Sequence, residues 1–175
     1  IGAFEGAVAG GIPIIKAFRE RLSTNRIKWL AGDINGTENL IQDKMGDKGR
    51  DINDDLAEAQ ALGYAEADPT FDVEGIDAGH KLTILASIAF GIPLQFDKVY
   101  TEGISNITGN DVSYAEQLGY RIKHLGIARK TEHGIELRVH PTLIPERRFI
   151  ANVDGVMNAV LVTVDALRPT LYFGA

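Results

Sequence analysis

The strongest constraint on the fold is the apolar run LTILASIAFGIPL at residues 82–94, in which Thr83 and Ser87 are the only polar side chains. The run is shorter than the roughly 20 apolar residues that a helix needs to cross a bilayer. It therefore predicts a helix buried in the core of a globular domain. Because acidic residues precede the run, we expect the longest helix of the chain over residues 72–90, with an acidic start and an apolar end.

Helical periodicity dominates the first two thirds of the chain, and strand alternation dominates the last third. The pattern is typical of an α+β fold, and we expect a mixed or antiparallel β-sheet covered by helices, in a single domain over residues 1–175. A first helix is predicted from Pro13, with Ile14, Ile15, Phe18 and Leu22 on its apolar side, and a second has Thr37 as its N-cap. A third carries Ile52, Leu56 and Ala59 on one face and is ended by Gly63. A short fourth helix is capped by Asn110 or Asp111 and ended by Gly119. The predicted strands are residues 26–34, a hairpin over residues 120–140 that turns at EHG, and the segments GVMNAVLVTVDAL and PTLYFG.

Composition excludes several classes of function. The 175 residues are 45% hydrophobic and 24% charged, with a net charge of −6, which is typical of a soluble globular domain and argues against a nucleic-acid partner. The absence of cysteine excludes disulfides, thiolate zinc sites and thiol catalysis, and it fits a cytoplasmic protein. We expect no membrane partner. The chain opens on IGAFEG and stops at LYFGA, which suggests a piece of a longer polypeptide.

The segment GYAEADPTFDVEGIDAGHK at residues 63–81 carries five carboxylates ahead of Lys81. Asp77 and Lys81 are four residues apart, so on a helix they share a face. One interpretation is a solvated helix start, because acids there are favoured by the helix dipole and an exposed ion pair contributes little. The other is a partly desolvated lysine whose charge a carboxylate tunes for proton transfer, since Lys81 adjoins an apolar run. Residue types alone favour the first interpretation.

A calcium loop is excluded in this segment. If Gly75 took the sixth position of an EF-hand, Thr70 would be the first ligand and Lys81 the twelfth. A threonine and a cation cannot serve at those two anchoring positions. The chain also lacks the G-x-G-x-x-G fingerprint, the Walker loop and H-E-x-x-H.

The glycine-rich opening FEGAVAGGIP is a second candidate site. Glycines let the backbone approach a ligand closely, and Glu5 with nearby carbonyls could bind a cation. A packed turn explains the same residues and is favoured when they are taken alone. The four histidines, 80, 124, 133 and 140, have no ligand spacing and are interpreted as structural or exposed.

Six motifs occur in the order found in homoserine dehydrogenases: FEGAVAGGIPIIKAFRE, GDINGTEN, EAQALGYAEADPTFDVEGIDAGHKLTILASIAFG, LGYRIKHLGIA, ELRVHPTLIP and GVMNAVLV. The chain resembles that family over its whole length, and the acid–lysine segment is highly specific to it. The resemblance implies the catalytic, substrate-binding and dimerisation domain, without the nucleotide-binding domain. It also implies the reversible NAD(P)-dependent interconversion of L-aspartate 4-semialdehyde and L-homoserine, in threonine, methionine and isoleucine biosynthesis.

The resemblance implies roles for individual residues. Lys81 would give a proton to the aldehyde oxygen during reduction, supported by Asp77. Glu66 would hold the ammonium group of the substrate, with Asp72 as a second acid at the substrate site. The remaining residues of this pocket would be Gly36 and Thr37.

The resemblance also implies a monovalent cation such as sodium, bound by Glu5 and by main-chain carbonyls. Those carbonyls would belong to Val8, Gly10 and Ile12. Glu38 departs from the family, where Thr or Ser is usual, so it either alters cofactor or substrate contacts or points to solvent. NADP or NAD would be bound mainly by the absent domain, and the partner would be a second copy in a homodimer. Two alternatives stay open: a related dehydrogenase of another amino-acid semialdehyde, and a non-catalytic dimerisation module.

Overall fold

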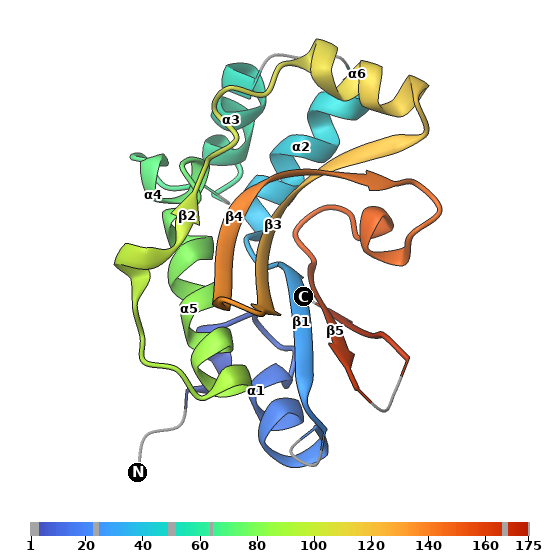
Figure 1. Cartoon of the computed structure of the whole chain (residues 1–175). Helices are drawn as coiled ribbons and strands as arrows, with labels where there is room; N and C mark the ends of the chain where they lie inside the picture. Colours follow the sequence, from blue (N-terminus) through green and yellow to red (C-terminus); the bar gives the residue numbers. More distant parts are fainter. Residues whose placement is uncertain (1–3, 23–24, 49–51, 64, 166–167, 175) are drawn as a thin grey trace.

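The computed structural model describes residues 4–22, 25–48, 52–63, 65–165 and 168–174. In this part of the chain, six strands form one sheet in the order β2-β4-β3-β1-β5-β6 (Figure 1). Four of its neighbouring pairs are antiparallel, and β2 runs parallel to β4. The sheet is therefore mixed, and the α+β prediction is confirmed. The strands are β1 Ile27–Asp33, β2 Tyr100–Thr101, β3 Tyr120–Thr131, β4 Gly134–Pro145, β5 Asn158–Val164 and β6 Thr170–Gly174.

Helices cover one face of the sheet and one of its ends. The longest described helix is α5, Ile76–Phe90, which packs along β3 and β4. α2, α3 and α6 gather at one end of the sheet, where a separate apolar cluster joins them (Figure 1). The other helices are α1 Ile14–Lys16 with a π turn at Ala17–Arg21, α2 Gly36–Lys48, α3 Ile52–Ala61, α4 Thr70–Val73, α6 Gly109–Gln117 and 3-10 turns at Glu5–Ala7, Phe96–Lys98 and Phe149–Asn152. Among the described residues, none of the helices combines the length and apolar character needed to cross a membrane.

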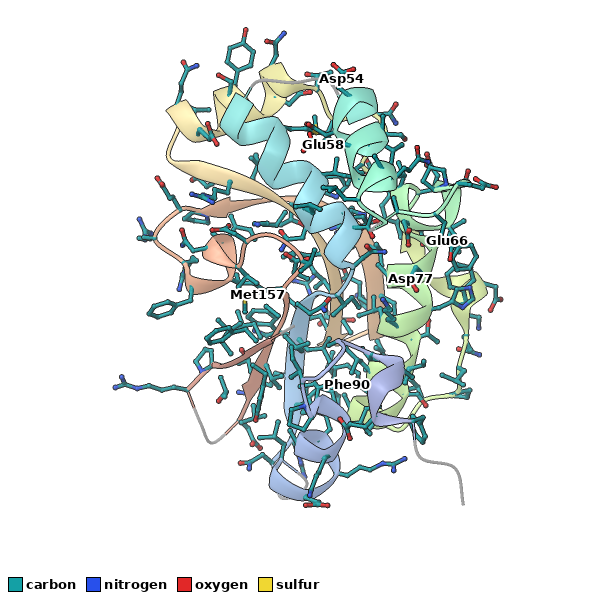
Figure 2. All side chains as sticks on the ribbon, turned by 180° about the vertical axis from the view of Figure 1, so that it is seen from behind. Asp54, Glu58, Glu66, Asp77, Phe90 and Met157 are labelled. Carbon is teal, nitrogen blue, oxygen red and sulfur yellow. The ribbon has the colours of Figure 1, made fainter. Side chains whose placement is uncertain are left out.

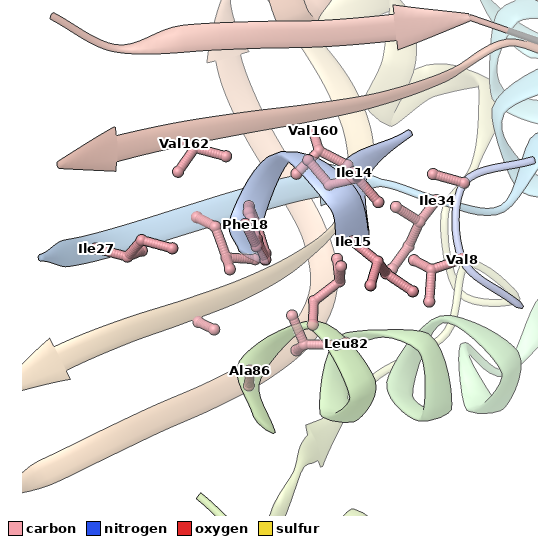
Figure 3. Packing of buried hydrophobic residues seen from close by; sticks show 14 of the residues in the cluster. Val8, Ile14, Ile15, Phe18, Ile27, Ile34, Leu82, Ala86, Val160 and Val162 are labelled. Atoms are coloured by element: carbon pink, nitrogen blue, oxygen red, sulfur yellow. The ribbon is translucent and has the colours of Figure 1, made fainter. Parts of the chain in front are cut away.

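The main core lies between α1, α5 and the sheet. Figure 3 shows Ile14, Ile15 and Phe18 of the first helical segment directed into the space between Leu82 of α5 and Val160 of β5. Each of these side chains is almost fully buried. Burial of one such side chain stabilises the fold by about 1.5–3 kcal/mol. The apolar side predicted for this helix is confirmed. The run at residues 82–94 is buried at Leu82, Leu85 and Ala86, but α5 ends at Phe90 and Leu94 is 66% exposed, so the end of the run is not part of a core helix.

The opposite face of the sheet is only partly covered. Trp29 of β1 and Leu161 of β5 lie on this face, and a 3-10 turn, Phe149–Asn152, covers one end of it. A groove of about 440 Å³ remains beside that turn, with Leu143 and Phe149 exposed at 60% and 85%. We call this surface the open face of the sheet.

Three predicted helix starts are wrong. The helix expected over residues 72–90 is two helices, because Gly75 takes the left-handed conformation, φ 74°, and separates α4 from α5. The N-cap of α2 is Asn35 and not Thr37, since Asn35 Oδ1 accepts the backbone N–H groups of Thr37 and Glu38. The N-cap of α6 is Thr108, which forms a capping box with Asp111.

The strand predictions are confirmed. Residues 26–34 contain β1, the hairpin turns between Thr131 and Gly134, and the last two apolar segments form β5 and β6. The short strand β2 was not predicted. It has only two residues, so alternation gives no signal over its length.

Candidate active site

Lys81 lies in the second turn of α5, one turn after Asp77. Its Nζ is 2.6 Å from Asp77 Oδ2 and donates a 3.0 Å hydrogen bond to the carbonyl oxygen of Ile34. The two side chains are 26% and 27% exposed, so the pair is mostly, but not fully, removed from water. An ammonium has three N–H donors. Two of the three donors of Lys81 have partners among the described residues, so one donor remains for a ligand.

Asn35 joins this pair to a second carboxylate. Its amide nitrogen donates to Asp72 Oδ1 at 3.0 Å and to Asp77 Oδ2 at 3.1 Å. The side-chain oxygen of Asn35 caps α2 at the same time. Three elements therefore converge here: the end of β1, α4 and the start of α5. Sequence reasoning missed Asn35, although an asparagine directly before a helix is a strong capping signal.

The other predicted pocket residues lie around this network. The backbone N–H of Thr37 donates to Asn35 Oδ1. A Cβ on Gly36 would lie 2.9 Å from the carbonyl oxygen of Val156, so a larger residue at position 36 would displace the loop after Val153. Glu66 lies in the exposed loop between α3 and α4, on the same side of the molecule as Asp77 (Figure 2). In the described part of the chain its carboxylate makes no hydrogen bond or ion pair with the network.

Behind the network lies a buried pair, Glu38 and His124. Glu38 Oε2 contacts His124 Nδ1, and both side chains are 1% exposed. Burial raises the pKa of Glu38, with His124 opposing and Asp72 and Asp77 adding to the rise. Burial opposes a charged imidazole, but the Glu38 carboxylate outweighs it and raises the pKa of His124. Glu38 thus does not point to solvent, and His124 is buried beside it.

A second lysine, Lys123, is buried next to this pair along β3. It is 1% exposed and donates to Asn39 Oδ1 at 2.6 Å and to the carbonyl oxygen of Val153 at 2.8 Å. The exposed Asp154 lies 3.6 Å from its Nζ. Asn39 also donates to Val153 and to Met157, so this set of residues ties α2 to the loop before β5.

At the predicted cation site, the structure gives Glu5 a role that the resemblance did not imply. The two carboxylate oxygens of Glu5 accept the backbone N–H groups of Ile15, at 2.7 Å, and Lys16, at 3.0 Å, so Glu5 caps the first helical segment. Within the described residues, no backbone N–H occupies the carbonyl oxygens of Val8 or Gly10. Ile12 accepts a 2.7 Å bond from Ile14. Oxygen donors of this kind fit a hard monovalent cation, provided Glu5 uses its remaining lone pairs.

The network can bind a cation and pass a proton. Two carboxylates fixed by Asn35 form an anionic surface, and Lys81 presents one N–H beside it. A lysine placed in this way has the geometry that a general acid needs. The fold and the site together define an α+β domain with a lysine–carboxylate pair that is mostly shielded from water.

Comparison with known proteins gives the family. The model of the homoserine dehydrogenase family matches residues 13–175, and the chain belongs to this family. A homoserine dehydrogenase from Pseudomonas aeruginosa is 75% identical over 175 residues, which is 100% of this chain and 40% of that protein. One from Neisseria gonorrhoeae is 66% identical over 98% of this chain and 40% of that protein.

Solved structures agree with this assignment. The crystal structure of a homoserine dehydrogenase from Thiobacillus denitrificans matches with a TM-score of 0.96 and 74% identity, over 98% of this chain and 40% of that one. A hyperthermophilic archaeal homoserine dehydrogenase in complex with NADPH matches with a TM-score of 0.82 and 28% identity, over 97% of this chain and 48% of that one. The chain thus spans about 40% of the length of its bacterial relatives named here.

Proposed function

We propose that the chain is the catalytic and substrate-binding part of an NAD(P)-dependent homoserine dehydrogenase. The reaction would interconvert L-aspartate 4-semialdehyde and L-homoserine, on the route to threonine, methionine and isoleucine. The observation that carries the proposal is the Lys81–Asp77 pair, which is mostly shielded from water and keeps one ammonium donor for a ligand. As the resemblance to a biosynthetic family implies, we expect a cytoplasmic location.

In the direction of reduction, Lys81 gives its proton to the aldehyde oxygen as the aldehyde carbon accepts a hydride. Asp77, 2.6 Å from the ammonium, orients it for the transfer. Asp72 and Glu66 would hold the ammonium group of the substrate. Glu66 is exposed in the loop between α3 and α4, where its carboxylate is accessible to that ammonium. Because the bound substrate is held with its aldehyde oriented toward Lys81, the two groups no longer have to meet by diffusion, which accelerates the reaction.

A nicotinamide dinucleotide supplies the hydride when it is bound. The chain carries no G-x-G-x-x-G fingerprint, so we expect the residues that hold its phosphates in other parts of the full-length protein. The partly exposed edge of the Lys81–Asp77 pair fits the arrival of a nicotinamide ring from outside this domain.

The proposal is tested on the full-length protein that contains this chain. Oxidation of L-homoserine is followed at 340 nm with NADP and then with NAD, as reduced nicotinamide forms. Other amino-acid alcohols are offered as competing substrates, which separates a homoserine dehydrogenase from a dehydrogenase of another semialdehyde. No turnover of any of them, together with no calorimetric binding of L-homoserine, would leave the non-catalytic dimerisation module.

We further propose that a second copy of the chain covers the open face of the sheet. That face combines the apolar groove with the exposed side chains of Leu143 and Phe149. Leu143→Asp should convert the full-length protein to monomers in sedimentation velocity. The matched control is Leu94→Asp, since Leu94 is exposed to a similar extent, 66%, but lies away from this face. Equal behaviour of the two variants would contradict the interface.

The monovalent cation also remains a proposal. Turnover of the wild-type protein in sodium chloride should exceed turnover in choline chloride at equal ionic strength. The difference should vanish in Glu5→Gln, which keeps a side-chain oxygen to accept an N–H at the start of α1 but loses the charge. If sodium has no effect on the wild type, Glu5 acts only as a helix cap.

A further inference from the structure

The buried pair Glu38–His124 shares one proton between two groups that are closed off from water. His124 Nδ1 contacts Glu38, and His124 Nε2 lies 2.8 Å from the carbonyl oxygen of Glu102. Both partners of the imidazole are therefore oxygen atoms. A charged imidazole donates to both of them, and a neutral imidazole donates to Glu102 while accepting from a protonated Glu38. Either arrangement satisfies the ring only while the pair retains its shared proton.

The pair contacts the candidate active site from two directions. The backbone N–H of Glu38 donates to Asn35 Oδ1 at 3.2 Å, and Asn35 in turn holds Asp77. On the other side, a Cβ added to Gly75 would lie 2.8 Å from His124 Cε1, so the ring packs against the corner from which α5 begins. Glu38 and His124 thus connect the start of α2 to the start of α5.

Several charged groups face the pair. Asp33 of β1 favours the charged form of His124, and Asp72 of α4 and Asp77 of α5 disfavour the charged form of Glu38. Beyond Asp77 lies the ammonium of Lys81. Loss of the shared proton would therefore leave one uncompensated negative charge on the pair, close to the like charges of Asp72 and Asp77.

We propose that Glu38 is a positioning residue of this site, which acts through His124 and Asn35 to hold Asp77 and Lys81 in place for proton transfer. Glu38 touches neither of those two side chains in any contact that the structure records, so its effect is indirect. The inference rests on the proposed function. It adds a residue that fixes the general acid.

The first experiment compares Glu38→Gln with wild type in the full-length protein. Glutamine keeps the shape of the side chain but cannot form the charged pair. Because small displacements of a reacting group cost large factors in rate, we expect kcat to fall about 30-fold, while KM for L-homoserine changes by less than about threefold. Asp154→Asn is the matched control, since it removes one carboxylate at a site that is 58% exposed, and its kcat should equal that of wild type.

A pH profile separates positioning from a merely structural role. In the wild type, loss of the shared proton changes the charge behind Asp77, so kcat should fall on the alkaline side of the profile. In Glu38→Gln that step should shift by at least about one pH unit or vanish. An unchanged kcat, or a uniform loss of kcat with the same pH profile, would overturn the proposal.

A second experiment does not depend on activity or on the folding of Glu38→Gln. Histidine is labelled with carbon-13 in the full-length protein, and the resonance of His124 is assigned by its loss in His124→Asn. Asp77→Asn removes a charge that opposes ionisation of Glu38, so the proton shared by the pair should be lost at a lower pH than in wild type. An identical titration in both proteins would overturn the coupling. Absence of homoserine turnover in the wild type would instead overturn the proposed function and leave this readout intact.

Discussion

The two lysines near the acidic cluster differ in what surrounds them. Lys123 is the more buried of the two, at 1% exposure, and its ammonium is held by Asn39 and by the carbonyl oxygen of Val153. Lys81 is 26% exposed and keeps one donor without a partner in the described residues. Burial of a lysine therefore does not mark a functional site by itself. What distinguishes Lys81 is an unused donor beside two carboxylates, within reach of a ligand.

The largest expected effect separates the two lysines by activity. Lys81→Ala in the full-length protein should lower kcat for L-homoserine oxidation about 10³-fold, because the proton donor is lost. The midpoint of thermal unfolding should stay within a few degrees of wild type, since Lys81 is partly exposed. Turnover at the wild-type level would remove Lys81 from the mechanism.

The converse effect is expected for Lys123. Lys123→Met should lower the free energy of unfolding by about 3 kcal/mol, because Asn39 and Val153 lose a charged partner inside the protein. Urea unfolding of the full-length protein, followed by circular dichroism, measures this loss. The variant that remains folded should keep its KM for L-homoserine within about twofold. If Lys123→Met instead raised KM strongly and kept full stability, Lys123 would be the functional lysine, contrary to the comparison made here.

A smaller effect compares two exposed acids, Glu66 and Asp154. Glu66→Gln should raise KM for L-homoserine about tenfold and leave kcat nearly unchanged, since a charge-assisted hydrogen bond to the substrate becomes neutral. Asp154→Asn, beside Lys123, should leave both constants unchanged. An equal KM in wild type and Glu66→Gln would reject the role of Glu66 in binding the ammonium.

The smallest effect concerns pH and stability. The pKa of His124 is raised by folding from 6.5 and that of Glu38 from 4.5, so the folded pair holds its shared proton more tightly than the same groups do in the unfolded chain. Stabilisation by His124 is complete below pH 6.5 and is lost as pH rises through its folded pKa. The free energy of unfolding should therefore decrease with pH above 6.5, by less than about 1.4 kcal/mol per pH unit for one proton.

This pH dependence should follow the pair and not the second lysine. In His124→Asn the slope above pH 6.5 should become shallower, whereas Lys123→Met should lower stability at every pH without changing the slope. Urea titrations at a series of pH values measure both. A slope that persists in His124→Asn would place the titrating group elsewhere.

Local patterns were sufficient to predict most of the fold. The alternation of Ile135, Leu137 and Val139 in β4 and the apolar side of α1 were read from the sequence, because each reflects burial of one face of an element. The pairing of Asp77 with Lys81 was also predictable, since it depends only on helix geometry. These features depend on neighbours within a few residues of one another.

The rest of the site depends on contacts between distant segments. Nothing in the sequence around Glu38 indicates that it meets His124, and the register that brings them together is set by packing of α2 on β3. The break at Gly75 likewise follows from tertiary packing, because the chain at Gly103 passes so close to Val73 and Glu74 that a Cβ there would overlap them. Asn35 was missed for a simpler reason, since Thr37 offered a competing cap two residues later.

The position of β1 in the sheet has a consequence for synthesis on the ribosome. β1 leaves the exit tunnel before both of its neighbours in the sheet, because its two hydrogen-bonding edges are taken by β3, which begins at Tyr120, and β5, which begins at Asn158. Neither partner exists until most of the chain has been translated. During that interval the nascent strand is unpaired and exposes Trp29 and Leu30. We therefore expect trigger-factor-like chaperones to bind this segment.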